Sequence, residues 1–401
     1  MFLSDGVNLA RVLHTRMNSG ERYDVAVIGA GVFGAWTALH LARRGKRVIL
    51  LEAYGPGHSR SSSGDESRII RMGYGKDEIY TQWSRRSLIQ WKELFAATGK
   101  EALFQNTGVL WLAGTDETRL EETRSTLKRC GVVFEDLDLA TLQKKYPQIG
   151  LDEIRSAIFE PHSGVLLARR AVAATVDEAI RHGVTFQHAR VESPQGKGAL
   201  KSIKTKNAEG IFAEQFVFAC GAWLAKIFPE IIGPKLFVTR QEVFYFGLPA
   251  GDARFAPPAL PTFLFQGDES YGMPDIESRG LKIALDRHGI SVDPDTQSRV
   301  VSEKSAQEMR EYVARRFPAL RDAPIAETRV CQYENTSNGD FLIDRAPEIE
   351  NVWFAGGGSG HGFKHGPAVG EYVTSQLLGE APAEPRFSLV AKETVQHRAV
   401  F

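Results

Sequence analysis

A glycine motif close to the N-terminus constrains the fold more than any other feature of this chain. Residues 29–34 read Gly-Ala-Gly-Val-Phe-Gly, after the apolar run 23–28 and before the helix-like run 32–44. A second apolar run, 47–51, ends at Glu52. A strand, a glycine turn, a helix and a strand ending in an acid form the βαβ unit that binds a dinucleotide. The glycines let the backbone approach the pyrophosphate, and Glu52 can accept hydrogen bonds from the adenosine ribose.

A second glycine-rich stretch lies near the other end of the chain. Residues 356–366 read Gly-Gly-Gly-Ser-Gly-His-Gly-Phe-Lys-His-Gly, between the strand-like run 351–355 and the helix-like run 368–378. Two such elements at opposite ends of one chain predict a flavin dinucleotide that is held from both sides. Lys364, inside the second element, predicts a substrate that carries a negative charge.

The remaining patterns predict an α/β fold with two interleaved domains. Further helices are expected at 79–97, 169–182 and 303–317, and further strands at 184–188, 199–205, 211–219, 238–246, 281–285 and 327–333. The run 211–219 leads to Gly221, which predicts another close approach of the backbone to the cofactor. Between about 235 and 335, strand-like runs separated by Pro-rich loops indicate a mainly antiparallel sheet. We expect an N-terminal extension (1–21), a Rossmann-like FAD-binding domain of the glutathione reductase type (22–103, 163–234 and 338–390) and a substrate domain (104–162 and 235–337).

Composition and charge narrow the classes of function. The 401 residues carry 49 basic and 49 acidic side chains, and no basic run interleaves with aromatic residues, so nucleic acid is not an expected partner. No apolar stretch reaches the roughly 18 residues of a spanning helix, and residues 1–16 lack the apolar core of a signal peptide; we expect that extension to be poorly ordered. Cys130, Cys220 and Cys331 are too few and too scattered for a disulfide framework or a metal site. A cytoplasmic monomer is expected, with no membrane partner.

A polar segment with two arginines three positions apart follows the first βαβ unit. Residues 61–71 read Ser-Ser-Ser-Gly-Asp-Glu-Ser-Arg-Ile-Ile-Arg. On a helix, Arg68 and Arg71 would share a face, whereas in an extended segment they point to opposite faces. One could then meet the flavin and the other a substrate anion. Two surface arginines are the alternative, but Ile69 and Ile70 between them favour burial.

These motifs together are similar to those of a known family. The sequence resembles the monomeric sarcosine oxidase family of flavoprotein amine oxidases, in the D-amino acid oxidase-like superfamily, which includes N-methyltryptophan oxidase, L-pipecolate oxidase and the fructosyl amino acid oxidases (amadoriases). The matching stretches run in family order from residue 23 to about 380: 29–34 with Glu52, 62–71, 271–282, 331–333 with 341–344, and 360–364.

For the cofactor, the resemblance implies FAD attached covalently through Cys331 as a thioether. A thiolate that adds to the flavin 8-methyl carbon needs partial exposure and a positive neighbourhood. Without that setting a lone cysteine is an inert buried side chain, as we expect for Cys130 and Cys220. Residues expected to contact the cofactor are Gly29, Gly31, Val32, Phe33, Gly34, Glu52, Ala53, His58, Ser62, Arg68, Ile69, Val191, Gly221, Cys331, Gly360, Gly362, Phe363 and Lys364.

For the substrate, the resemblance implies that Arg71 and Lys364 bind a carboxylate, by a bidentate fork and a point charge. Lys282 falls where a lysine near flavin N5 promotes the reduction of oxygen, since a fixed cation stabilises developing superoxide. Tyr271 and Tyr333 match tyrosines that line the substrate cavity. Residues expected to act in catalysis are Lys282, Arg68, Arg71, Lys364, Tyr271, Tyr333 and Asp286.

Two departures from the family pattern bear on the substrate. Ser62 and Ser63 stand where sarcosine oxidases carry histidines. Asp286 stands where the sarcosine and pipecolate enzymes have histidine and amadoriases have an acid; a surface aspartate paired with Arg287 is the alternative. His361 is expected to have a mainly structural role.

The resemblance implies an FAD-dependent oxidase that acts on the CH–NH bond of secondary or N-substituted α-amino acids, with oxygen as acceptor. Hydride passes to flavin N5, the imine hydrolyses to an amine and an aldehyde or oxo acid, and oxygen becomes hydrogen peroxide. An amadoriase-like or pipecolate-type substrate remains open. The alternatives of other classes are an amino acid dehydrogenase that uses a carrier instead of oxygen, and a non-catalytic flavin- or nicotinamide-binding protein.

Overall fold

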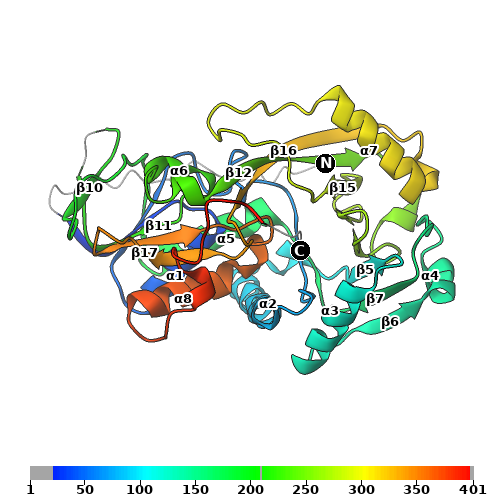
Figure 1. The fold of residues 1–401 in the computed structure, drawn as a ribbon, viewed down its shortest axis with the longest axis horizontal. Coiled ribbons are helices and arrows are strands. Elements are labelled where there is room, and N and C mark those ends of the chain that lie inside the picture. The colour runs from blue at the N-terminus through cyan, green and yellow to red at the C-terminus, as the bar shows by residue number, and fades with distance from the viewer. Residues whose placement is uncertain (1–20, 208–209, 398–401) are drawn as a thin grey trace, which may run out of the picture.

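Two large β-sheets organise the protein and form the two sides of the view in Figure 1. The structure is a computed structural model and describes residues 21–207 and 210–397. The extension predicted for residues 1–21 lies, apart from its last residue, outside the described residues. Within the described part, no helix combines the length and the apolar character needed to cross a membrane.

The first sheet has seven strands in the order β17-β18-β11-β1-β2-β9, with β10 beside β11. The central strands from β18 to β9 pair in parallel, whereas β17 and β10 are antiparallel to their neighbours. Helix α1 packs against α5 and α8, and these helices with the central parallel strands make up the Rossmann-like domain predicted. The strands are β1 (Arg22–Ile28), β2 (Val48–Glu52), β9 (Thr185–His188), β10 (Ser202–Lys204), β11 (Gly210–Phe218), β17 (Leu342–Arg345) and β18 (Val352–Gly356).

Two glycines of the first motif are required by the turn between β1 and α1. Gly29 has φ +101°, and a Cβ there would lie 2.4 Å from the carbonyl oxygen of Ala219 at the end of β11. A Cβ on Gly34 would lie 1.8 Å from the oxygen of Gly29. Any side chain at either position would push the turn away from the sheet, so glycine is what brings the start of α1 over the strand ends.

The second sheet has eight strands in the order β16-β12-β15-β14-β13-β5-β7-β6. Its described pairs are antiparallel except β5 with β13, as the prediction of a mainly antiparallel sheet requires. The long strands β12 and β16 run across the top of the view in Figure 1, between the two sides of the molecule. The strands are β5 (Val109–Ala113), β6 (Glu135–Asp138), β7 (Ser156–Glu160), β12 (Phe237–Phe246), β13 (Thr262–Phe265), β14 (Ser270–Met273), β15 (Leu281–Leu285) and β16 (Ile325–Asn335).

A small three-stranded sheet, eight α-helices and several short 3-10 turns complete the regular structure of the described residues. The small sheet pairs β3 with β8 and β8 with β4, and β3 carries Arg68 at its start. Its strands are β3 (Arg68–Ile70), β4 (Phe104–Gln105) and β8 (Gly164–Leu166). The helices are α1 (Val32–Arg43), α2 (Glu78–Thr98), α3 (Thr118–Arg129), α4 (Leu139–Lys145), α5 (Ala168–Arg181), α6 (Leu224–Ile227), α7 (Glu303–Arg316) and α8 (Gly366–Leu377).

The strands and helices predicted from the sequence are confirmed to within a few residues at their ends. Sequence reasoning missed strands β4 to β8, β13, β14 and β17 and helices α3, α4 and α6. Some of these strands, such as 109–113, are buried throughout and show no alternation. The domain boundaries stay a prediction, since sheet membership locates strands and not the points where domains begin. The last helix begins at Gly366, two residues before the expected start at 368, and follows a 3-10 turn over Phe363–His365.

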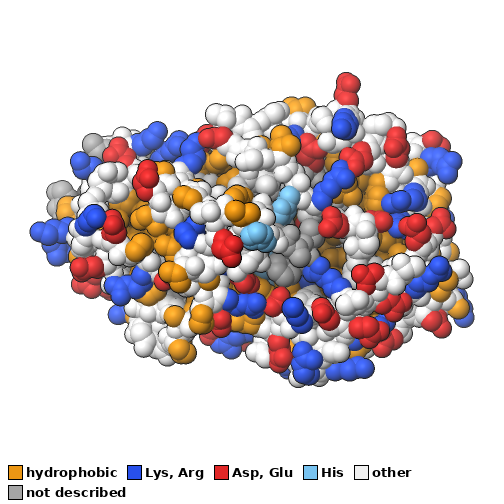
Figure 2. All heavy atoms as spheres, in the orientation of Figure 1, with side chains coloured by type: hydrophobic (Ala, Val, Ile, Leu, Met, Phe, Trp, Pro, Cys, Tyr) orange, Lys and Arg blue, Asp and Glu red, His pale blue; other side chains and the backbone are white. Residues whose placement is uncertain are grey.

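Acidic and basic side chains alternate over the surface in Figure 2, where red and blue atoms are interspersed on the face shown. This distribution agrees with the equal totals of 49 acidic and 49 basic residues. The predicted absence of a nucleic acid partner rested on that balance and stays a prediction.

Candidate cofactor and substrate site

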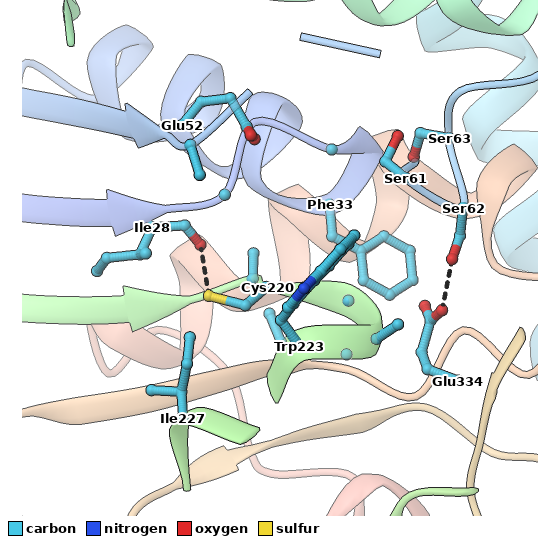
Figure 3. Close-up of a pocket in the computed structure, with 18 of the residues that line it drawn as sticks. Ile28, Phe33, Glu52, Ser61, Ser62, Ser63, Cys220, Trp223, Ile227 and Glu334 are labelled. Carbon is cyan, nitrogen blue, oxygen red and sulfur yellow. Dashed lines mark hydrogen bonds between the residues drawn. The ribbon is translucent and has the colours of Figure 1, made fainter. Parts of the chain in front are cut away.

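A cavity of about 390 Å³ lies at the carboxyl ends of β1, β2, β11 and β18, between the two glycine-rich regions. Its volume is within the range of roughly 300–1,000 Å³ that is usual for ligand pockets. Figure 3 shows Phe33, Glu52, Trp223 and Glu334 around it. The predicted cofactor residues that line it are Gly29, Gly31, Val32, Phe33, Glu52, Ala53, His58, Ser62, Arg68, Val191, Gly221, Gly360, Gly362 and Phe363. Four others do not line it, namely Gly34, Ile69, Cys331 and Lys364.

The Glu52 carboxylate is held in place at the end of β2. Oε2 accepts a hydrogen bond from the backbone N–H of Ala30 at 2.8 Å, and Oε1 accepts one from Tyr54 N–H at 2.9 Å. Each oxygen keeps acceptor capacity for a hydroxyl from the cavity. At the start of α1, Ser63 Oγ accepts from Val32 N–H at 3.1 Å, so Ser63 caps the positive end of that helix.

Near Glu52, aromatic rings form another part of the cavity wall. The ring of Tyr54 lies 4.9 Å from that of His58 and 6.0 Å from that of Trp223, measured between centroids. Burial, with the charges of Arg60 and Arg299, lowers the pKa of His58 to about 4, so this ring is neutral at neutral pH. Neutral aromatic faces suit a flat heterocycle such as adenine.

A buried acid faces the cavity from the end of β16. Ser62 Oγ donates to Glu334 Oε2 at 2.8 Å, as Figure 3 shows. Burial raises the pKa of Glu334, against the opposing hydrogen bond from Ser62. Ser62, which the sequence predicted to contact the cofactor, therefore contacts an acid of the cavity wall.

An ion cluster with Asp65 at its centre lies behind Arg68. Lys282 Nζ donates to Asp65 Oδ2 at 2.6 Å and to Ser67 O at 2.9 Å, and Arg68 binds the same Asp65 oxygen. Burial opposes ionisation of Asp65, but the charges of Lys282 and Arg68 outweigh it and hold the pKa of this carboxyl below its usual range. Burial lowers the pKa of Lys282, while the Asp65 carboxylate counteracts that change. The cluster is a fixed arrangement of paired charges.

Cys331 lies against this cluster. Its Sγ accepts a hydrogen bond from Arg68 Nη2 at 3.4 Å. The positive neighbour that we predicted is present, but the exposure is lower than expected, at 8% of the residue. Burial raises the pKa of the Cys331 thiol, whereas Arg68 acts to lower it. By contrast, Cys220 lines the cavity and donates to Ile28 O at 3.4 Å; burial raises its pKa as well.

Arg71 and Lys364 come together around Tyr74. The Arg71 guanidinium lies 4.4 Å from the ring centre of Tyr74 and 4.7 Å from that of Trp111. Lys364 Nζ donates to Tyr74 Oη at 2.7 Å and to His361 O at 2.8 Å. Burial and the charge of Arg71 lower the pKa of Lys364 well below its ordinary value. Two buried cations on one tyrosine form a place that an anion can enter.

The extended conformation of β3 separates Arg68 from Arg71, as predicted for an extended segment and not for a helix. Arg68 lines the cavity, whereas Arg71, just after the strand, lies between Tyr74 and Trp111. Both side chains are largely buried, so the surface alternative is wrong for both. Lys364 follows Phe363, which lines the cavity, so the backbone at Lys364 lies beside the cavity wall.

Asp286 lies in the same region as Lys364 and Tyr333. Its Oδ1 accepts from Tyr333 Oη at 2.9 Å, and Tyr333 lines the cavity. The Asp286 charge acts to raise the pKa of Lys364. Arg287 instead pairs with Glu308, so the alternative of an Asp286–Arg287 surface pair is wrong.

Tyr271 is the remaining predicted catalytic residue. On β14 it pairs in register with Ala284 of β15. Burial raises its pKa, so the phenol stays protonated at neutral pH, and Tyr333 is among its hydrogen-bond partners.

Several residues of the site were missed by sequence reasoning. They are Asp65, Trp223, Glu334, Tyr74 and Trp111. A signal existed for Asp65 only: an acid three positions before a predicted buried arginine needs a cation partner. The others come from strands and turns whose spacing carries no motif.

Comparison with known proteins agrees with this geometry. Residues 24–376 match the FAD dependent oxidoreductase family, and the chain belongs to that family. The monomeric sarcosine oxidase of Streptomyces avermitilis is 30% identical, over 90% of this chain and 95% of its own length. The N-methyl-L-tryptophan oxidase of Salmonella newport is 26% identical, over 90% and 96%. The structure of Aspergillus fumigatus fructosamine oxidase (amadoriase II) has the same fold, with a TM-score of 0.78 at 22% identity, over 92% and 89%.

The cavity fits the FAD on which this family depends. Glycine turns at Gly29 and Gly360 bring the backbone to its walls, the start of α1 faces it, and Glu52 offers carboxylate oxygens. The predicted fold and the predicted use of FAD are thus confirmed, and the protein is an FAD-dependent oxidoreductase. How each side chain serves the reaction remains a matter for proposal.

Proposed function

We propose that this protein oxidises secondary or N-substituted α-amino acids in the manner of the sarcosine oxidases, releasing an imine and hydrogen peroxide. The observation that carries the proposal is the Arg71–Lys364 pair next to the cofactor cavity, where Lys364 is bonded to the neutral oxygens of Tyr74 and His361. A buried cation with neutral partners gains most from an arriving carboxylate. Plain amines lack that group, so the pair selects amino acids.

The roles of the side chains follow from their positions. The chemistry that bound FAD would supply is acceptance of a hydride from the carbon beside the substrate nitrogen and transfer of the two electrons to oxygen. Arg71 and Lys364 orient the carboxylate, and Tyr333 and Tyr271 line the space beside it. Lys282, paired with Asp65, supplies a fixed positive field for the reduction of oxygen. The imine leaves and hydrolyses to an amine and an aldehyde or oxo acid.

Covalent attachment of FAD through Cys331 belongs to the same proposal. Arg68, 3.4 Å from Sγ, stabilises a thiolate there. The intact mass of the denatured protein should exceed the polypeptide mass by one FAD, and Cys331→Ala should abolish the increment. Cys220→Ala is the matched control, because that thiol lines the cavity and should leave the increment unchanged. An unmodified mass in a flavin-loaded parent would reject the attachment.

The experiment that tests the function is a panel of N-substituted amino acids assayed for hydrogen peroxide. Sarcosine, N-methyltryptophan, pipecolate and a fructosyl amino acid cover the related substrate classes. Flavin reduction without peroxide would indicate a dehydrogenase that needs a carrier, and no reduction by any member would indicate a binding protein. We propose a cytoplasmic monomer that needs only the small-molecule substrate and oxygen.

A second substrate class, fructosyl amino acids, is favoured by Asp286. Its carboxylate lies on Tyr333 at the cavity wall, where it can accept hydrogen bonds from sugar hydroxyls or bind a cationic side chain. On this alternative, sarcosine is a poor member of the panel.

A further inference from the structure

The carboxylate of Glu160, at the end of β7, is completely enclosed and accepts hydrogen bonds from four neutral donors. Its residue is 1% exposed. The donors are the backbone N–H groups of Met72 at 2.7 Å and Gly73 at 3.0 Å, the indole N–H of Trp111 at 2.7 Å, and the hydroxyl of Ser163. Such a set uses the whole acceptor capacity of a carboxylate. Burial of a carboxylate is costly, and these four hydrogen bonds offset that cost.

Two of these donors control Arg71 directly. The Arg71 guanidinium donates to the carbonyl oxygen of Gly73, whose N–H Glu160 holds. The ring of Trp111, whose N–H Glu160 also holds, lies 4.7 Å below the same guanidinium. The ring of Tyr74 lies 4.4 Å from the same guanidinium. One carboxylate therefore orients both the backbone and the aromatic surface on which Arg71 rests.

We propose that Glu160 is a positioning residue that fixes Arg71 for recognition of the substrate carboxylate. This inference rests on the proposed function, because it assigns to Glu160 the alignment of the carboxylate-binding pair. Glutamine is not equivalent, since its amide N–H₂ would face donors that need an acceptor. The Glu160 charge also acts to raise the pKa of Lys364, which favours the ammonium that the anion needs.

Glu160→Gln is the first variant, measured with the best substrate of the panel and with the primary amide of that substrate. We expect kcat/KM for the acid to fall by about tenfold to a hundredfold, mainly through KM, because a small displacement of a binding group has effects of that size. Turnover of the amide, which lacks the carboxylate, should change by less than about twofold. The ratio of acid to amide is the readout, since a loss of stability alone would lower both equally.

Glu178→Gln is the matched control. Glu178 is also a buried glutamate, on α5, where it pairs with Arg181 and His182. This variant should keep the parental ratio. If Glu160→Gln does not fold, Trp111→Phe decides: it removes one donor and keeps an aromatic ring under Arg71, so the ratio should fall severalfold.

The outcomes separate the two proposals. If the parent discriminates acid from amide, and Glu160→Gln or Trp111→Phe lowers both rates by the same factor, Glu160 is a structural residue and the inference is rejected. If the parent itself does not discriminate, the carboxylate-binding role of Arg71 and Lys364 is wrong, and the positioning role falls with it.

Discussion

Lys282 and Lys364 are both buried lysines next to the cofactor cavity, but their partners differ in charge. Lys282 is bonded to the carboxylate of Asp65 at 2.6 Å, which Arg68 shares. Lys364 is bonded to the neutral oxygens of Tyr74 and His361. Burial lowers the pKa of each ammonium, and an adjacent acid counteracts that effect strongly only at Lys282.

The difference between these partners indicates a different role for each lysine. Lys282 and Arg68 share one acid, Asp65, so this cluster keeps a fixed net positive charge although each of its cations already has a partner. A cation held by neutral groups keeps an unmet charge, which an incoming carboxylate can match. The first arrangement suits reduction of oxygen, and the second suits substrate binding. Four predictions test this contrast.

The largest expected effect is on stability and differs in sign between the two lysines. Lys282→Met breaks a buried ion pair and should lower the free energy of unfolding by roughly 3–5 kcal/mol. Lys364→Met removes a buried charge with neutral partners and should leave that free energy unchanged or raise it. Urea unfolding of the flavin-loaded proteins measures both.

The loss of stability expected for Lys282→Met depends on pH in a definite direction. The pKa of Asp65 lies below its usual range in the folded protein, so its stabilisation is fully present above the unfolded carboxyl pKa of about 3.9 and is lost as the pH falls through the folded value. The deficit of Lys282→Met should therefore be full at neutral pH and shrink in acid. If Lys282→Met and Lys364→Met destabilise the protein equally, the proposed contrast between the two lysines is wrong.

The next largest effect concerns the rate at which oxygen reoxidises the reduced flavin. Lys282→Met should slow the reoxidation of reduced flavin by about a hundredfold or more, because it removes a fixed cation beside a developing anion. Anaerobic reduction by substrate should be affected less. Stopped-flow measurement separates the two half-reactions, and Lys364→Met, which should reoxidise at the parental rate, is the control. A parental rate in Lys282→Met would refute the role.

A smaller effect is expected for the carboxylate pair. Arg71→Met or Lys364→Met should lose roughly 2–4 kcal/mol of transition-state binding, or about 30-fold or more in kcat/KM. The steady-state rate of peroxide formation measures it. Lys392→Met is a matched control, since Lys392 is equally buried but binds Arg386 O and Asn338. An amide substrate that reacts as well as the acid in the parent would contradict the assignment.

The smallest effect concerns recognition of the part of the substrate that lies away from its carboxylate. Asp286→Ala should weaken turnover of fructosyl or cationic amino acids by about 1 kcal/mol, roughly fivefold, through loss of one hydrogen-bond acceptor. Small N-methyl amino acids should be spared. Asp252→Ala, which removes an acid paired with Arg254, controls for charge. Should sarcosine prove the best substrate of the panel, Asp286 does not set specificity.

Several parts of the site were predictable because they depend on local sequence. The βαβ unit follows from Gly29, Gly34 and Glu52, whose spacing is imposed by one turn and one helix. The opposite orientation of Arg68 and Arg71 follows from the alternation of an extended strand. These features need only the backbone conformation of a short segment, which the sequence determines directly.

Tertiary structure alone decided which charges are matched. Asp65, in the bend before β3, meets Lys282 of β15 although 217 residues separate them, and Glu160 of β7 reaches Met72 and Gly73, which follow β3 of the small sheet. Sequence determined that this chain binds a dinucleotide and carries buried cations. Whether each cation faces an acid or a neutral oxygen depends on long-range packing, because hydrogen bonds of this kind form only when the two sheets have come together.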